Sequence, residues 1–140
     1  MKFTNGFWLM REGFSATYAL QAHHANIVSN PDGSLTWVSF EGETHTGIFG
    51  FAEPVGEAAD LAGADLIFIP AMAVDQTGQR LGKGKGYYDR ALGELENVAP
   101  VIAVVFDDEL LETVPTEDHD HPVDAAVTPS STTRFSNRLN

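Results

Sequence analysis

Two short apolar runs in the second half of the chain predict strands that are buried on both faces. They cover residues 65–70 (Asp-Leu-Ile-Phe-Ile-Pro) and residues 101–106 (Val-Ile-Ala-Val-Val-Phe). Both runs are short and rich in β-branched or aromatic residues, which is typical of strands inside an α/β sheet. A shorter apolar run at residues 123–127 predicts a third strand.

A helix is predicted between the first two strands. Residues 86–96 carry apolar side chains at helical spacing, namely Tyr87, Tyr88, Ala91, Leu92 and Leu95. The order strand, loop, helix, strand predicts a right-handed crossover and therefore a largely parallel sheet. Ligands of such sheets bind beyond the carboxyl ends of the strands. The segment that follows the first strand therefore lies on the side of the sheet where a ligand is expected.

Less regular segments predict loops and short elements. Residues 71–80 predict a loop with a turn at residues 76–78, and residues 107–112 predict a short helix capped by Asp107 or Asp108.

The first part of the chain gives weaker signals. Residues 30–33 (Asn-Pro-Asp-Gly) predict a turn, residues 35–40 a half-buried strand, and residues 47–56 a glycine-rich loop. Residues 1–29 contain scattered aromatic side chains and predict strands only weakly. The Ser/Thr/Asn-rich residues 129–140 predict a frayed tail.

Length and composition indicate a single domain spanning residues 1–140, with 43% hydrophobic residues to form a core. The chain has no cysteine, which excludes disulfides and thiolate metal sites. It has no run of ~20 apolar residues and no basic segment leading into an apolar one at its start, so we expect a cytoplasmic protein. The formal net charge of -12 argues against nucleic-acid and membrane partners.

The positive charges gather at one place. Residues 80–90 (Arg-Leu-Gly-Lys-Gly-Lys-Gly-Tyr-Tyr-Asp-Arg) hold four of the chain's 8 Lys and Arg residues. Glycines at every second position expose backbone N–H groups, and a helix that follows adds partial positive charge. The pattern predicts a phosphate site. The alternative is a solvated, flexible basic loop.

Other chemistries find less support. The Walker pattern and the Gly-x-Ser-x-Gly elbow are both absent from the sequence. His119, Asp120 and His121 suggest a metal site, because alternate residues of an extended segment share a face. A polar surface loop is the alternative that we favour.

From about residue 33 onward the chain resembles the 5-formyltetrahydrofolate cyclo-ligase family. The glycine run, in the form Arg-Leu-Gly-x-Gly-x-Gly-Tyr-Tyr-Asp, is the most specific part of the resemblance. The matching stretches are residues 51–54, 65–75, 78–90, 104–106, 119–120 and 123–128. The resemblance implies a three-layer α/β fold with a largely parallel sheet flanked by helices, incomplete at its N-terminus. It covers residues 33–128 and leaves residues 1–32 as an atypical segment.

The family converts 5-formyltetrahydrofolate to 5,10-methenyltetrahydrofolate with ATP and Mg²⁺. By resemblance Arg80, Lys83 and Lys85 are catalytic, holding the triphosphate as charge moves. The ATP-binding residues implied are Arg80, Leu81, Gly82, Lys83, Gly84, Lys85, Gly86, Tyr87 and Tyr88. The reduced folate would contact Lys83, Gly84, Lys85, Gly86 and Tyr87.

Asp89 and Asp124 match the family's magnesium positions. Two carboxylates suffice for Mg²⁺, since phosphates and waters complete its octahedron. The alternatives are a carboxylate in the first helical turn, favoured there by the helix dipole, for Asp89 and a strand-edge residue for Asp124.

The family's opening basic helix and its folate-contacting glutamate have no counterpart in residues 1–32. The expectation is weak or absent turnover by this chain alone. The alternative function is a non-catalytic nucleotide- or phosphate-binding domain, or a degraded family member.

Overall fold

The computed structural model describes residues 25–39, 42–48, 50, 52–59, 64–82, 84–94 and 99–139. Contacts divide the chain into two compact units, residues 1–61 and 62–140. The single domain stays a prediction, and the strands expected before residue 25 lie outside the described residues. The expected boundary after residue 32 falls inside a hairpin of the first unit.

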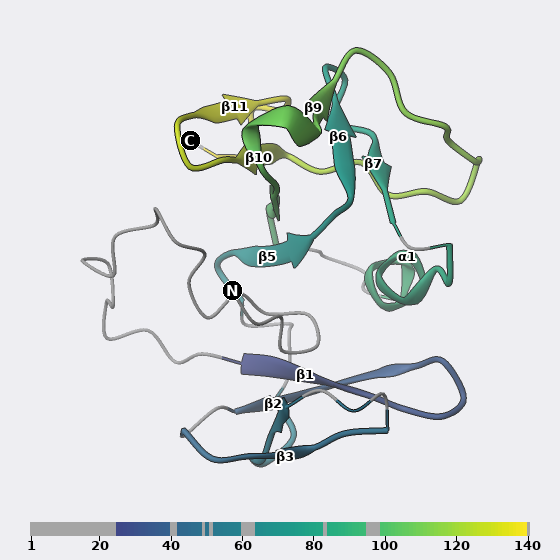
Figure 1. Ribbon diagram of the computed structural model, residues 1–140, viewed down its shortest axis with the longest axis vertical. Helices are drawn as coiled ribbons and strands as arrows, with labels where there is room; N and C mark the ends of the chain where they lie inside the picture. The colour runs from purple at the N-terminus through teal and green to yellow at the C-terminus, as the bar shows by residue number, and fades with distance from the viewer. Residues whose placement is uncertain are drawn as a thin grey trace. The chain divides into compact units, whose positions relative to one another are not determined.

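The first unit contains two antiparallel hairpins. Strand β1 (Ala25–Ser29) pairs with β2 (Leu35–Ser39), and residues 30–33 form the predicted turn between them. Strand β3 (Thr44–Thr46) pairs with β4 (Ala52–Pro54). Figure 1 shows the β1–β2 hairpin with its turn at one end. The loop expected at residues 47–56 is therefore wrong over β4, whose Glu53 is buried and accepts a hydrogen bond from the Ser29 N–H at 3.1 Å.

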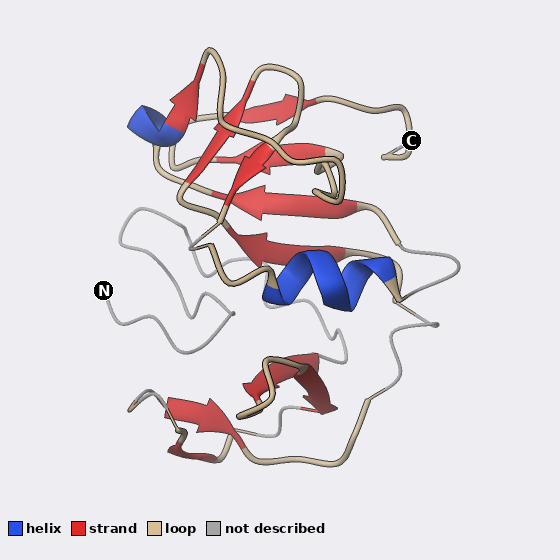
Figure 2. Cartoon of the chain, turned by 90° about the vertical axis from the view of Figure 1, so that its right-hand side faces the viewer, coloured by secondary structure: helices blue, strands red, loops and turns tan. Residues whose placement is uncertain are grey.

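The main sheet of the second unit has the strand order β11-β10-β8-β5. Strands β5 (Ile67–Pro70), β8 (Val101–Val104) and β10 (Ala125–Val127) are parallel, which confirms the three predicted strands. Every residue of β8 is buried, as the continuous apolar run predicted. In β5 Phe68 is 37% exposed, so the prediction of burial on both faces is wrong for that strand. Helix α1 (Tyr87–Gly93) runs along the direction of these strands (Figure 2). Residues 95 and 96 of the predicted helix lie outside the described residues.

A second, smaller sheet precedes and follows α1 in the sequence, with the order β7-β6-β9. Strand β6 (Ala73–Asp75) pairs antiparallel with β7 (Arg80–Leu81) and parallel with β9 (Leu110–Leu111). The prediction of a loop at residues 71–80 is wrong, although the turn at residues 76–78 is confirmed. The segment is a hairpin whose tip is tied by hydrogen bonds to a buried carboxylate, described below.

The short helix predicted at residues 107–112 is a single 3₁₀ turn, η3 (Asp107–Glu109), followed directly by β9. Its N-cap is Phe106, so the predicted cap by Asp107 or Asp108 is wrong. The Glu109 carboxylate accepts the Phe106 N–H at 2.6 Å and satisfies this end of the turn. Asp107 instead accepts the hydroxyl of Ser130 at 2.6 Å.

The residues expected to fray carry strand β11 (Thr132–Arg134), which pairs antiparallel with β10 at the edge of the main sheet. The pairing extends beyond β11, because the Phe135 N–H donates to the carbonyl of Asp124 at 2.9 Å. The tail is thus held by main-chain pairing, which its polar composition did not reveal. Within the described residues, no helix has the length and apolar character needed to cross a membrane.

Candidate functional site

The glycine run follows β7 and leads into α1. Gly84 and Gly86 have positive φ angles of 81° and 64°, a conformation that side chains with a Cβ rarely adopt. The N–H groups of Gly82, Gly84 and Gly86 make no hydrogen bond within the described part of the chain. A Cβ placed on Gly84 would meet open space. The run therefore presents free backbone donors, the feature that an anion-binding loop requires.

Two aromatic rings at the start of α1 pack against arginine side chains. Arg80 lies 5.9 Å from the centroid of the Tyr88 ring, and Arg90 lies 5.6 Å from that of Tyr87. Burial raises the pKa of the Tyr88 hydroxyl, and the positive charge of Arg80 only partly opposes this shift. Tyr88 thus stays protonated at neutral pH. The predicted contacts of both rings with a nucleotide or folate stay predictions.

Arg80 is the buried cation of the site. Its side chain is only 4% exposed, and Nη2 donates to Asp89 Oδ1 at 2.5 Å. Its Nε is buried without a hydrogen-bond partner among the described residues. Of the other predicted cations, Lys85 is exposed and Lys83 lies outside the described residues.

Asp89 connects the glycine run to a distant segment of the chain. Besides the Arg80 guanidinium, its Oδ1 accepts the backbone N–H of His121 at 3.1 Å. Within the described part of the chain, Oδ2 makes no hydrogen bond. A carboxylate so held keeps one oxygen with which it can bind a cation.

Asp124, the other predicted magnesium ligand, is occupied by internal donors. Its Oδ2 accepts the Val101 N–H at 2.8 Å and Nη1 of Arg138 at 3.1 Å. Its Oδ1 accepts the Ser136 hydroxyl at 2.5 Å. Asp89 thus keeps an oxygen without a donor among the described residues, whereas both oxygens of Asp124 already accept hydrogen bonds. The described residues contain no group of three His, Asp or Glu side chains that could hold a metal.

Asp75 is a buried, hydrogen-bonded carboxylate that was not among the predicted site residues. It is buried, and Oδ1 accepts the Thr77 N–H, the Thr77 hydroxyl and the Gln79 N–H, while Oδ2 accepts the Val114 N–H. Burial by itself raises the pKa of Asp75, but these hydrogen bonds together bring the pKa below its usual value of 3.8. The pattern Asp-x-Thr-Gly, typical of a side-chain-capped turn, was the available signal.

The histidine cluster forms a polar loop. His119 is 68% exposed, and its Nε2 lies 3.4 Å from the Glu117 carboxylate. Its next acidic neighbour is Asp120 at 3.9 Å.

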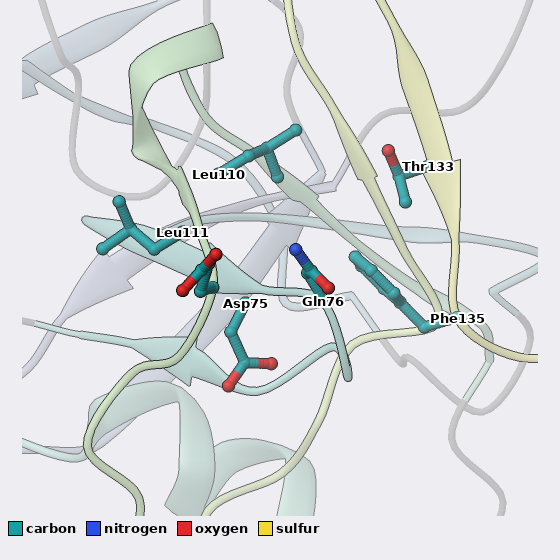
Figure 3. A pocket seen from close by; sticks show the side chains of 7 residues that line it. Asp75, Gln76, Leu110, Leu111, Thr133 and Phe135 are labelled. Atoms are coloured by element: carbon teal, nitrogen blue, oxygen red, sulfur yellow. The ribbon is translucent and has the colours of Figure 1, made fainter.

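A shallow hollow lies elsewhere in the second unit, with a volume of about 270 Å³ (Figure 3). Leu110 and Leu111 of β9 form one side, and Phe135 forms the other. It is lined by Asp75, Gln76, Leu110, Leu111, Glu112, Thr133 and Phe135. None of the residues predicted to bind a ligand takes part in it.

Comparison with known proteins supports the family resemblance that is based on the glycine run. The model of the 5-formyltetrahydrofolate cyclo-ligase family matches residues 17–129. The chain belongs to this family. The matched region begins at residue 17 and not at the predicted residue 33, and it extends over most of both units.

Individual relatives match shorter stretches. The 5-formyltetrahydrofolate cyclo-ligase of Mycolicibacterium smegmatis is 50% identical over 78 residues, which cover 56% of this chain and 37% of that protein. A methenyltetrahydrofolate synthase domain-containing protein of Mus musculus is 31% identical over an alignment of 114 residues, which covers 75% of this chain and 30% of that protein. The chain thus spans well under half the length of these relatives.

A solved structure shows the same fold. The NMR structure of Aquifex aeolicus 5,10-methenyltetrahydrofolate synthetase superposes with a TM-score of 0.66 at 31% sequence identity. The match covers 81% of this chain and 59% of that one. The expected α/β class is confirmed, although α1 is the one α-helix within the described residues.

Proposed function

We propose that this chain binds the phosphates of ATP at the glycine run and takes part in the ATP- and Mg²⁺-dependent conversion of 5-formyltetrahydrofolate to 5,10-methenyltetrahydrofolate. The supporting observation is that the N–H groups of Gly82, Gly84 and Gly86 have no hydrogen-bond partner among the described residues, and that Gly82 lies close to the buried guanidinium of Arg80. Backbone donors and a fixed cation are the groups that stabilise phosphate charge.

In this proposal Arg80, Lys83 and Lys85 balance the charge of the triphosphate. The formyl oxygen attacks the γ-phosphorus and ADP leaves. The neighbouring folate nitrogen then attacks the activated carbon and releases its proton, and phosphate departs with the former formyl oxygen. Catalysis of this kind depends on positioning and charge neutralisation more than on covalent chemistry by the protein.

Magnesium, when bound, would supply further neutralisation of the phosphate charge. Asp89 would hold it through Oδ2, and Asp124 would join after release of its Arg138 contact. The folate would lie against residues 83–87. The cytoplasmic location and the absence of nucleic-acid and membrane partners stay predictions.

A second candidate is a nucleotide-binding domain without cyclo-ligase turnover. The mouse relative, whose match covers more of this chain than the mycobacterial enzyme's match does, is named for a domain rather than for a reaction. In that case ATP binds, but addition of 5-formyltetrahydrofolate produces neither a heat of binding nor the methenyl product.

Calorimetry on the full chain separates these functions. MgATP is titrated first and 5-formyltetrahydrofolate second, with product followed by the absorbance of the methenyl compound. Lys85→Glu should weaken MgATP binding about tenfold, because it reverses a charge inside the run. Arg134→Glu is the matched control, since Arg134 is an exposed residue of β11 and its reversal should change affinity less than about twofold. Absence of any MgATP binding by the wild-type chain would contradict both candidates.

A further inference from the structure

Arg80 carries more donors than its partners use. A guanidinium has five N–H donors, and burial of a charge is unfavourable unless its donors are paired. Among the described residues, Asp89 is the carboxylate that pairs with Arg80, through Nη2. Nε is buried and unpartnered, and Nη1 makes no hydrogen bond there either.

Nη1 of Arg80 lies close to Gly82, the first glycine of the run. A Cβ placed on Gly82 would lie 3.2 Å from Nη1 of Arg80, so the guanidinium comes close to the backbone at Gly82. The free N–H groups of the run begin at the same residue. Nη1 and the Gly82 N–H are thus neighbouring donors that lack an acceptor among the described residues.

Asp89 is well suited to fix the guanidinium in this place. Its Oδ1 is held from a second direction by the His121 N–H at 3.1 Å, so the carboxylate cannot follow the arginine freely. The Arg80–Asp89 contact of 2.5 Å joins the first residue of β7 to the first turn of α1, across the whole glycine run. Because the long Arg80 side chain is already ordered, it loses less conformational entropy when a ligand binds.

We propose that Asp89 is a positioning residue for Arg80, in a role that needs no metal. It holds the guanidinium so that Nη1 is directed to a polyphosphate in the glycine run. This inference rests on the proposed function, since it presumes that the run binds phosphate. It adds that Asp89 contributes to anion binding although its own charge is negative.

The test uses tripolyphosphate as the probe, with the full chain in EDTA, so that no metal-mediated effect remains. Asp89→Asn removes one negative charge next to the site, and Coulomb's law alone predicts tighter anion binding. Loss of positioning predicts the opposite. We expect Asp89→Asn to bind tripolyphosphate about tenfold more weakly than the wild type. Asp65→Asn is the matched control, an exposed aspartate whose loss should leave binding within about twofold.

Affinity of Asp89→Asn equal to or above that of the wild type would overturn the positioning role. Should Asp89→Asn fail to fold, Asp89→Glu replaces it, since it keeps the charge but displaces the carboxylate by one methylene. Weaker binding by that variant supports the role, and wild-type affinity overturns it. A wild-type chain that does not bind tripolyphosphate overturns the proposed phosphate site itself, and this inference with it.

Discussion

Replacing Asp124 with alanine should destabilise the second unit by about 2–4 kcal/mol. The side chain is 7% exposed and accepts three hydrogen bonds, from Val101, Ser136 and Arg138. The Val101 N–H has no access to water in this position, and leaving it without an acceptor costs about 1–3 kcal/mol. Loss of the bond from the Ser136 hydroxyl adds about 1 kcal/mol. Arg138 is 51% exposed, so its ion pair adds less than about 1 kcal/mol.

Amide hydrogen exchange in β8 is the appropriate assay. Both tryptophans, Trp8 and Trp37, belong to the first unit, so their fluorescence does not report on this sheet. Where exchange of the Val101–Val104 amides follows unfolding of the sheet, 2–4 kcal/mol corresponds to rates about 30- to 1,000-fold faster.

Two variants make the result interpretable. Arg138→Ala removes only the exposed partner and should accelerate exchange less than about fivefold. Asp118→Ala removes an exposed carboxylate and should leave the rates unchanged. Exchange in Asp124→Ala no faster than in Asp118→Ala would refute the reasoning, and so would an Arg138→Ala effect as large as that of Asp124→Ala.

Two further predictions concern the hairpin and the glycine run. The lowered pKa of Asp75 means that its stabilisation is complete above its unfolded pKa of 3.8 and is lost as pH falls through the lower folded value. The difference in free energy of unfolding between wild type and Asp75→Asn should therefore be constant near neutral pH and shrink as the pH falls below about 4; a difference that stays constant down to about pH 3 in urea titrations would contradict this. Gly84→Ala should cost about 1–2 kcal/mol from its positive φ alone. Gly78→Ala should cost more, because its Cβ would lie 2.7 Å from the Val123 carbonyl oxygen; equal losses in thermal unfolding would show that the contact is irrelevant.

The main strands could be predicted because each is an uninterrupted apolar run, although of β5 and β8 only β8 is buried on both faces. β5 and β8 are continuous apolar runs, and no polar residue interrupts β8. The hairpin β6–β7 lacks this mark, since it ends one strand with Asp75 and begins the next with Arg80, both buried. Buried charges are rare unless paired, so only their partners, which lie elsewhere in the fold, reveal them as strand residues.

The same reason explains the other differences. Strand β4 contains Glu53, whose burial depends on a donor in β1, and β11 is exposed along its whole length. Neither strand has an alternating apolar face that could be recognised. Both strands form because they pair with neighbouring strands, β4 with β3 and β11 with β10.

For the site, spacing predicted the loop and its free N–H groups, but not how its charged side chains pair. The Arg80–Asp89 contact depends on the path of the glycines between them. The engagement of Asp124 with Ser136 and Arg138 depends on the course of a tail that was expected to fray. The three contacts are products of tertiary structure.

The parallel register of the main sheet has a consequence for how the chain folds. In the β1–β2 hairpin Ser29 pairs with Leu35 across a short turn, whereas Ile67 must find Val101 beyond a hairpin and a helix. Closing a long loop costs entropy before any stabilising contact forms, and this slows folding. The amides of the second unit should therefore become protected later than those of the first. Until then β8, apolar along its entire length, is available to other unfolded chains. Refolding at high concentration should consequently lose material through aggregation of this strand.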